Sequence, residues 1–76
     1  MAISPNPVAD RLVVDNFRNI ARMEVFNVFG QRLATISTAG DQHAEINVTR
    51  FPAGVYTITG YNAQGMLIGN AKFVKQ

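Results

Sequence analysis

The side chains that could catalyse a reaction or bind a metal are few in this sequence and lie far apart. His43 is the only histidine, and cysteine is absent, which excludes disulfides, thiolate metal sites and thiol catalysis. The carboxylates occur singly, at Asp10, Asp15, Glu24, Asp41 and Glu45. A paired-carboxylate hydrolase needs two of them facing one cleft, for which a chain of 76 residues has little volume. The sequence therefore predicts a non-enzymatic protein with no catalytic residue, metal or cofactor, and His43 is expected to be a solvated strand residue.

Three glycines, Gly30, Gly54 and Gly65, lie at separate turns and do not form a phosphate-binding loop, because no helix that could hold an anion follows any of them. Gly30 is expected to supply the positive φ of a hairpin with a bulge. The segment Phe51-Pro52-Ala53-Gly54 has the residues of a type I turn, with Pro second and Gly fourth. Gly65 closes a hairpin connection that contains Asn62 near its start. All three are interpreted as turn residues.

Polar and apolar residues alternate along short segments that are separated by Gly, Pro and Asn, which is the pattern of strands. No segment has the periodicity of an amphipathic helix. Residues 4–7 are expected to form an extended lead-in at a sheet edge, because prolines cannot donate to a sheet. The predicted strands cover residues 11–15, 21–27, 31–37, 43–48, 54 to about 59, and 66–75, with connections at 16–19 and 39–42. This spacing favours an all-β sandwich, with a closed small barrel as the alternative.

Within these strands the expected inward residues are Leu12, Val14, Ala44, Ile46 and Val48. The third strand is irregular: Leu33 and Ile36 are three residues apart, so either one faces solvent or a bulge intervenes. The core of a chain this small depends on a few large side chains. The aromatic residues expected to supply them are Phe26, Phe51, Tyr56 and Phe73.

The composition is 47% hydrophobic and 16% charged, which predicts a folded domain rather than a disordered tail. The net charge of +2 is spread evenly along the chain without a basic stripe, which argues against nucleic-acid binding. The sequence contains no run of 18 apolar residues, so no membrane-spanning helix is predicted. A single domain over residues 1–76, cut from a longer protein, is expected.

The final strand is the segment where a functional interpretation competes with a structural one. Lys72 and Lys75 flank apolar Phe73 and Val74. The strand could be an ordinary edge that its charges protect from aggregation. It could equally be a recognition strand, because an exposed edge can dock another protein by strand addition. Edge strands could also pair two copies into a homodimer.

Four motifs occur in the order found in one known family. They are Pro5-Asn6-Pro7-Val8 with Asp10-Arg11-Leu12; Glu24-Val25-Phe26-Asn27-Val28-Phe29-Gly30-Gln31; Ile46-Asn47-Val48 through Pro52-Ala53-Gly54-Val55-Tyr56; and Gly65 leading to Lys72-Phe73-Val74-Lys75. Each motif alone is weak, but together they cover residues 3–75. In this order the chain resembles the C-terminal sorting domain of type IX secretion, type A.

The resemblance implies a seven-stranded, immunoglobulin-like antiparallel sandwich at the C-terminus of a secreted cargo protein of a Gram-negative bacterium. Such a domain passes through the periplasm and directs its cargo across the outer membrane. In the family, a sortase-like peptidase typically removes the domain and attaches the cargo to lipopolysaccharide at the cell surface. Lys72, Phe73, Val74 and Lys75 would be read by the translocation machinery. Pro5, Asn6 and Pro7 would mark the start of the domain.

A second function class is an accessory immunoglobulin-like module that binds carbohydrate or protein for a neighbouring enzyme. Sugar binding by a sandwich usually relies on exposed aromatic platforms. Phe17, Phe29 and Tyr61 are the candidates, and they form no obvious row in the sequence.

Overall fold

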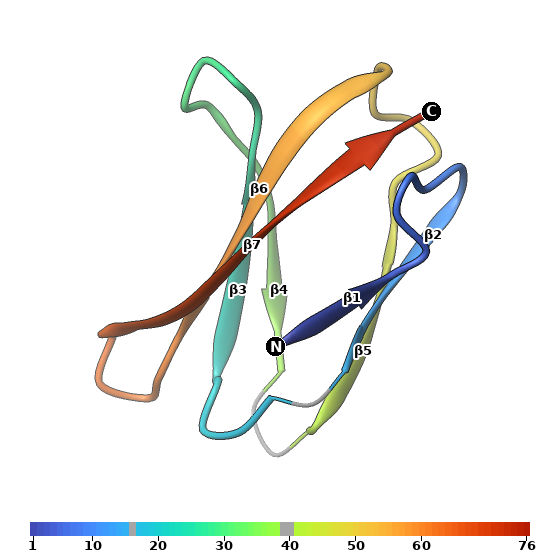
Figure 1. The fold of residues 1–76 in the computed structure, drawn as a ribbon. Coiled ribbons are helices and arrows are strands. Elements are labelled where there is room, and N and C mark those ends of the chain that lie inside the picture. The colour runs from blue at the N-terminus through green and yellow to red at the C-terminus, as the bar shows by residue number, and fades with distance from the viewer. Residues whose placement is uncertain (16, 39–40) are drawn as a thin grey trace.

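The chain forms two antiparallel β-sheets stacked face to face (Figure 1). The computed structural model describes residues 1–15, 17–38 and 41–76, and within these ranges it contains seven strands and no helix. The strands are β1 (Ala2–Ser4), β2 (Arg11–Asp15), β3 (Arg22–Phe26), β4 (Arg32–Ser37), β5 (His43–Asn47), β6 (Gly54–Tyr61) and β7 (Leu67–Lys75). The predicted all-β sandwich is confirmed, and the barrel alternative is wrong because the strands divide into two separate sheets.

The order of strands is immunoglobulin-like with one displacement. One sheet runs β1-β2-β5 and the other β4-β3-β6-β7. An immunoglobulin constant domain has its first, second, fifth and fourth strands in one sheet and its third, sixth and seventh in the other. Here β4 pairs with β3, so the fourth strand has joined the opposite sheet. This change widens the sheet that ends in β7 to four strands.

The core lies between the two sheets and consists mostly of the inward-facing residues of the strands. Each of the five residues that the alternation predicted to point inward is buried: Leu12, Val14, Ala44, Ile46 and Val48. Met23 and Val25 of β3 and Ile58 of β6 face them from the other sheet. Because successive side chains of a strand point to opposite faces, the polar residues between them reach solvent.

Two stacked aromatic rings fill the end of the core near the start of β6. Tyr56 and Phe73 are cross-strand partners whose ring centroids are 5.4 Å apart, and Phe51 lies 5.3 Å from Tyr56 on its other side. The Tyr56 hydroxyl donates a hydrogen bond of 2.5 Å to the carbonyl oxygen of Pro52, four residues upstream. A tyrosine that bonds back to the backbone at this corner is a hallmark of immunoglobulin-like sandwiches.

The aromatic prediction was right for Tyr56 and Phe73 and wrong for Phe26. Phe26 is only half-buried, because it lies on the outer face of its sheet, where it pairs with Thr57. Phe17 fills the core instead, with 3% of its surface exposed. It follows β2 in a connection, so strand alternation gave no signal for its burial.

The connections were predicted in place more often than in detail. Leu33 is the extra residue at a register shift between β3 and β4, and it is exposed. Both alternatives predicted for this strand, a bulge and a solvent-facing Leu33, therefore hold. The hydrogen-bonded turn before β6 lies three residues earlier than expected, because the Phe51 N–H donates to the Val48 carbonyl at 3.0 Å. The connections expected at 16–19 and 39–42 fall partly outside the described residues, at Asn16, Ala39 and Gly40.

Candidate functional site

The residues expected to be read by a partner lie in the last part of β7, an edge strand of the four-stranded sheet. Along one edge β7 pairs with its neighbour β6, from Leu67 to Lys75 (Figure 1). This long hairpin places the C-terminal strand along one edge of the sheet. The site is therefore one strand that has an inner face, an outer face and one edge that is not paired with β6.

The four predicted recognition residues divide between the two faces of the sheet. Phe73 is fully buried, and Lys75 is 8% exposed, with its Nζ donating to the Gln76 carbonyl at 2.9 Å. Lys72 and Val74 point outward, opposite Thr57 and Val55 of β6. In the folded domain a partner can touch Lys72 and Val74, whereas Phe73 contributes to packing.

The outer edge of β7 is covered over its last residues by a segment that we call the N-terminal clasp, Asn6–Val8. The Val8 N–H donates to the Val74 carbonyl, and the Gln76 N–H donates to the Val8 carbonyl, both at 2.8 Å. The Asn6 side chain acts as a further backbone unit: its Oδ1 accepts from the Val74 N–H at 2.9 Å. The residues flanking Asn6 are prolines, which lack an N–H, so the Asn6 side chain also supplies the donor that their backbone cannot: its Nδ2 donates to the Lys72 carbonyl oxygen at 3.5 Å.

The expectation that the terminal residues offer a free edge for strand addition is wrong. From Lys72 onward β7 is hydrogen-bonded to β6 on one side and to the N-terminal clasp on the other. Strand pairing there would have to displace the clasp. Among the described residues, the outer edge from Leu67 to Ala71 pairs with no further strand. A homodimer through edge strands stays a prediction, and along β7 it has only this stretch available.

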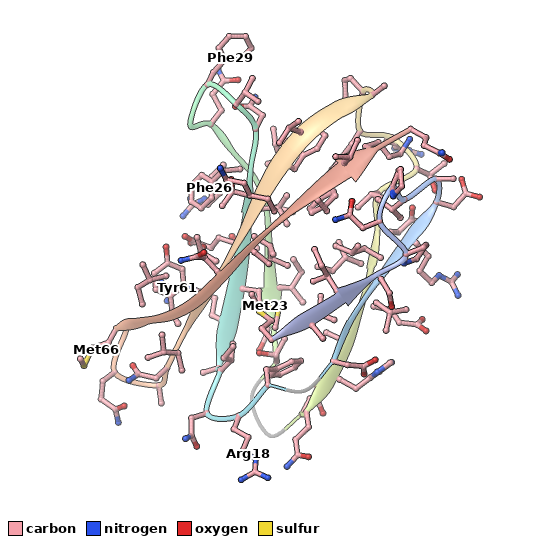
Figure 2. The ribbon with its side chains drawn as sticks, viewed as in Figure 1. Arg18, Met23, Phe26, Phe29, Tyr61 and Met66 are labelled. Carbon is pink, nitrogen blue, oxygen red and sulfur yellow. The ribbon has the colours of Figure 1, made fainter. Side chains whose placement is uncertain are left out.

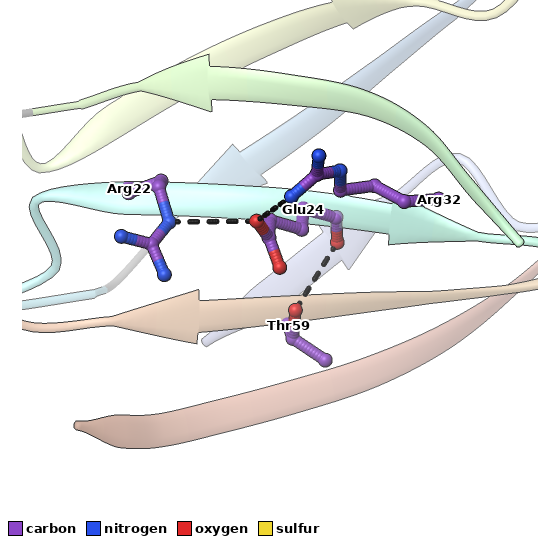
Figure 3. A network of polar contacts seen from close by, with 4 residues as sticks. All are labelled: Arg22, Glu24, Arg32 and Thr59. Atoms are coloured by element: carbon purple, nitrogen blue, oxygen red, sulfur yellow. Dashed lines mark hydrogen bonds and ion pairs between the residues drawn. The ribbon is translucent and has the colours of Figure 1, made fainter. Parts of the chain in front are cut away.

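The outer face of the same sheet carries a polar network whose residues were not among the predicted site residues (Figure 3). Glu24 is only 7% exposed although it faces outward, because two arginines lie over it. Its Oε2 is 3.1 Å from Arg32 Nη1 and 3.6 Å from Arg22 Nε. The Thr59 hydroxyl donates to the Glu24 carbonyl at 3.4 Å. The alternation of Arg22, Met23 and Glu24 was a signal that the two charges share a face.

This outer face holds the whole net charge of the chain. It carries three of the seven basic side chains and one of the five acidic ones, a net of +2, while the remaining four and four cancel. The cations are Arg22, Arg32 and Lys72. A basic patch does exist, assembled from three different strands, and for that reason it was invisible as a run in the sequence.

The residues with acid-base chemistry are not brought together. His43 lies opposite Asp15 at the end of the other sheet, with Nδ1 2.5 Å from Oδ1, and both side chains are about half exposed. The hydrogen bond to Asp15 raises the pKa of His43 above its ordinary value. Among the residues that the structure describes, no group of three or more His, Cys, Asp or Glu side chains could hold a metal. Nor is any helix there long and apolar enough to cross a membrane.

The aromatic platforms of the alternative function are largely removed by the fold. Phe17 is buried, and the guanidinium of Arg22 lies over the ring of Tyr61, 4.4 Å from its centroid. Only Phe29 remains as an exposed aromatic of the three candidates, with 83% of its surface exposed. A row of platforms for a sugar chain is not formed by these residues.

The fold and the site together define a small immunoglobulin-like module that presents a sheet face and a strand edge. A family model described as the secretion system C-terminal sorting domain matches residues 2–76. The chain belongs to this family, the C-terminal sorting domains of type IX secretion. Comparisons with curated proteins and with solved structures gave no match. Membership implies export across the outer membrane of a Gram-negative bacterium, contact with the secretion machinery and attachment to a cargo.

Proposed function

We propose that this domain forms the C-terminal end of a secreted cargo protein and is recognised by the type IX machinery as a folded module. The observation that carries the proposal is the extent of the family match, which runs over residues 2–76 and so includes every strand from β1 to β7. The sorting information therefore coincides with a whole sandwich. After export, a sortase-like peptidase removes the domain and anchors the cargo at the cell surface.

Within this proposal, Lys72 and Val74 are the residues of β7 that the machinery touches. Both are exposed on the positively charged outer face of the four-stranded sheet. Phe73 and Lys75 serve recognition indirectly, by fixing β7 against the core. Pro5, Asn6 and Pro7 stand at the junction with the cargo and close the edge of the same strand.

The basic test is a reporter with an export signal fused in front of residues 1–76, in a host that has the secretion system. The reporter is expected on the surface or in the medium, and its retention in the periplasm would refute the proposal. Deleting residues 72–76 would be a poor test of recognition, because the deletion removes buried Phe73. A point substitution that spares the core is better.

Lys72→Glu reverses a charge at an exposed position of β7, and Arg50→Glu makes the same charge change in the exposed turn before β6. If β7 is read from its outer face, Lys72→Glu lowers the exported fraction while Arg50→Glu leaves it unchanged. Equal export of both variants would remove Lys72 from the recognition surface. Circular dichroism of the two purified domains checks that both remain folded.

A further inference from the structure

Two hairpin loops of this domain have the same backbone design. One connects β3 to β4 over Asn27–Gln31, and the other connects β6 to β7 over Asn62–Met66. In each, the N–H of the asparagine donates to the carbonyl of the last residue, at 3.0 and 2.9 Å. In each, the glycine at the fourth position has a positive φ, 79° at Gly30 and 82° at Gly65.

The asparagine side chain organises both loops. Asn27 Oδ1 accepts from the N–H groups of Phe29 and Gln31, at 2.9 and 3.0 Å. The equivalent oxygen of the other loop accepts from Gln64 and Met66 at 3.0 and 2.9 Å. A side-chain acceptor that ties down two N–H groups restricts the loop to one backbone conformation. The loops are therefore matched in backbone and in these hydrogen bonds, and the β3–β4 loop has one more, from Asn27 Nδ2 to Gln31 Oε1 at 2.9 Å.

They differ in the two residues at the tip and in the last residue, which is Gln31 in one loop and Met66, 63% exposed, in the other. The β6–β7 loop has Ala63 and Gln64 at its second and third positions, whereas the β3–β4 loop has Val28 and Phe29. Val28 is 69% exposed and Phe29 is 83% exposed. The loop design does not require these apolar side chains, because its twin forms the same bonds without them. Two large apolar side chains in water at one tip are a liability unless they serve binding.

The β3–β4 tip projects away from the body of the sandwich. The pairing of β3 with β6 ends at Phe26 and Thr57, so the loop residues that follow Phe26 are not paired with β6. In Figure 1 the loop extends past the sheet, and in Figure 2 the Phe29 ring lies at its outermost point, pointing away from the core. A partner can reach this ring without disturbing any contact inside the domain.

We propose that Val28 and Phe29 are an anchor that inserts into an apolar pocket on a protein of the export machinery. This inference rests on the proposed function and names a contact for it. Binding energy at protein interfaces concentrates on a few residues, and a rigidly held aromatic that fills a pocket is the usual centre of such a site. Because its backbone conformation is already fixed by Asn27, the loop loses little conformational entropy on binding.

The charged side chain next to the tip predicts which residues surround the mouth of the partner's pocket. Arg32 follows the loop directly, and 61% of its side chain is exposed. It belongs to the outer face that carries the net charge of +2. The pocket is therefore lined by apolar side chains and rimmed by acidic ones on the side of Arg32. A lipid surface fits less well, since interfacial binding needs a larger apolar face than two side chains provide.

The matched loops supply the variant and its control. Val28→Ala with Phe29→Gln gives the β3–β4 loop the tip residues of its twin, so the hydrogen bonds of the loop are kept. Ala63→Ser with Gln64→Ser alters the equivalent exposed positions of the β6–β7 loop. Each pair is introduced into the reporter fusion, and the exported fraction is measured together with the thermal midpoint of the purified domain.

The tip variant is expected to lower export about tenfold at an unchanged thermal midpoint, and the control to export like the parent. Phe29→Leu, which keeps an apolar side chain, is expected to export far better than Phe29→Gln. Equal export of parent and tip variant overturns the inference and leaves the proposed function standing. Failure of the parent fusion to export overturns the proposed function itself. Phe29-dependent sedimentation of the domain with phosphatidylcholine–phosphatidylglycerol vesicles would replace the protein pocket by a lipid surface and so overturn the inference.

Discussion

The N-terminal clasp makes a quantitative prediction through Val8. Its N–H donates to Val74 of β7 and its carbonyl accepts from Gln76, and its side chain is fully buried in the core. Val8→Ala removes two methyl-sized groups from the core, which costs about 1.6 kcal/mol of transfer free energy at about 0.8 kcal/mol each. The cavity left behind adds up to about 1 kcal/mol. We expect a loss of about 1.6–2.6 kcal/mol, a large part of a total that is about 4–11 kcal/mol for a chain of this length.

The matched control is Val74→Ala, the same chemical change in the residue to which Val8 is hydrogen-bonded. Val74 is 42% exposed on the outer face, so its truncation is expected to cost about 0.5 kcal/mol. Urea unfolding followed by circular dichroism measures both variants. In thermal melts Val8→Ala is expected to lower the midpoint by about 6–21 °C, at about 4–8 °C per kcal/mol. Similar small losses for the two variants would refute the reasoning that the clasp is packed into the core.

Three further predictions concern single polar contacts. Tyr56→Phe keeps the stacked ring but loses the hydrogen bond to the upstream backbone, so the free energy of unfolding in urea should fall by about 1 kcal/mol; an unchanged value would contradict a stabilising corner. Glu24→Gln removes the charge of a nearly buried carboxylate that contacts two arginines, and it should lower the free energy of unfolding by about 1–2 kcal/mol. Glu45→Gln makes the same change in an exposed ion pair and should leave the free energy of unfolding almost unchanged. Equal losses in the two variants would argue against burial as the source of the Glu24 effect. NMR titration should give His43 a pKa above 6.5, and the Asp15→Asn variant should lower that pKa. Because the pKa of His43 is raised in the folded state, its pair with Asp15 stabilises the fold below about pH 6.5. This stabilisation is lost as the pH rises through the pKa of the folded state.

The strands could be predicted because their signal is local. Alternation placed Leu12, Val14, Ala44, Ile46 and Val48 inward without knowledge of their partners, since each strand must turn one face to the core. Alternation also puts Phe26 on the outer face with Glu24, so the prediction that it belongs to the core was wrong because it relied on the size of the side chain. Burial of Phe17 could not be predicted, because its position depends on how the connection after β2 closes the sandwich.

The site was predictable in sequence position but not in geometry. The alternation of Lys72, Phe73 and Val74 already implied that they could not all face one partner. Closure of the edge by Asn6 depends on a contact between residues 68 positions apart, which no periodicity reports. The basic outer face was likewise hidden, because strand order, and not sequence order, brings Arg32 and Lys72 to one surface.

The measurement that tests the central claim most directly is the location of a reporter fused to this domain in two otherwise identical strains. One strain has an intact type IX system and the other lacks its translocation machinery. If the folded domain is the sorting signal, the reporter leaves the cell only in the first strain and accumulates in the periplasm of the second. The same distribution in both strains would contradict the claim that this sandwich directs its cargo outward.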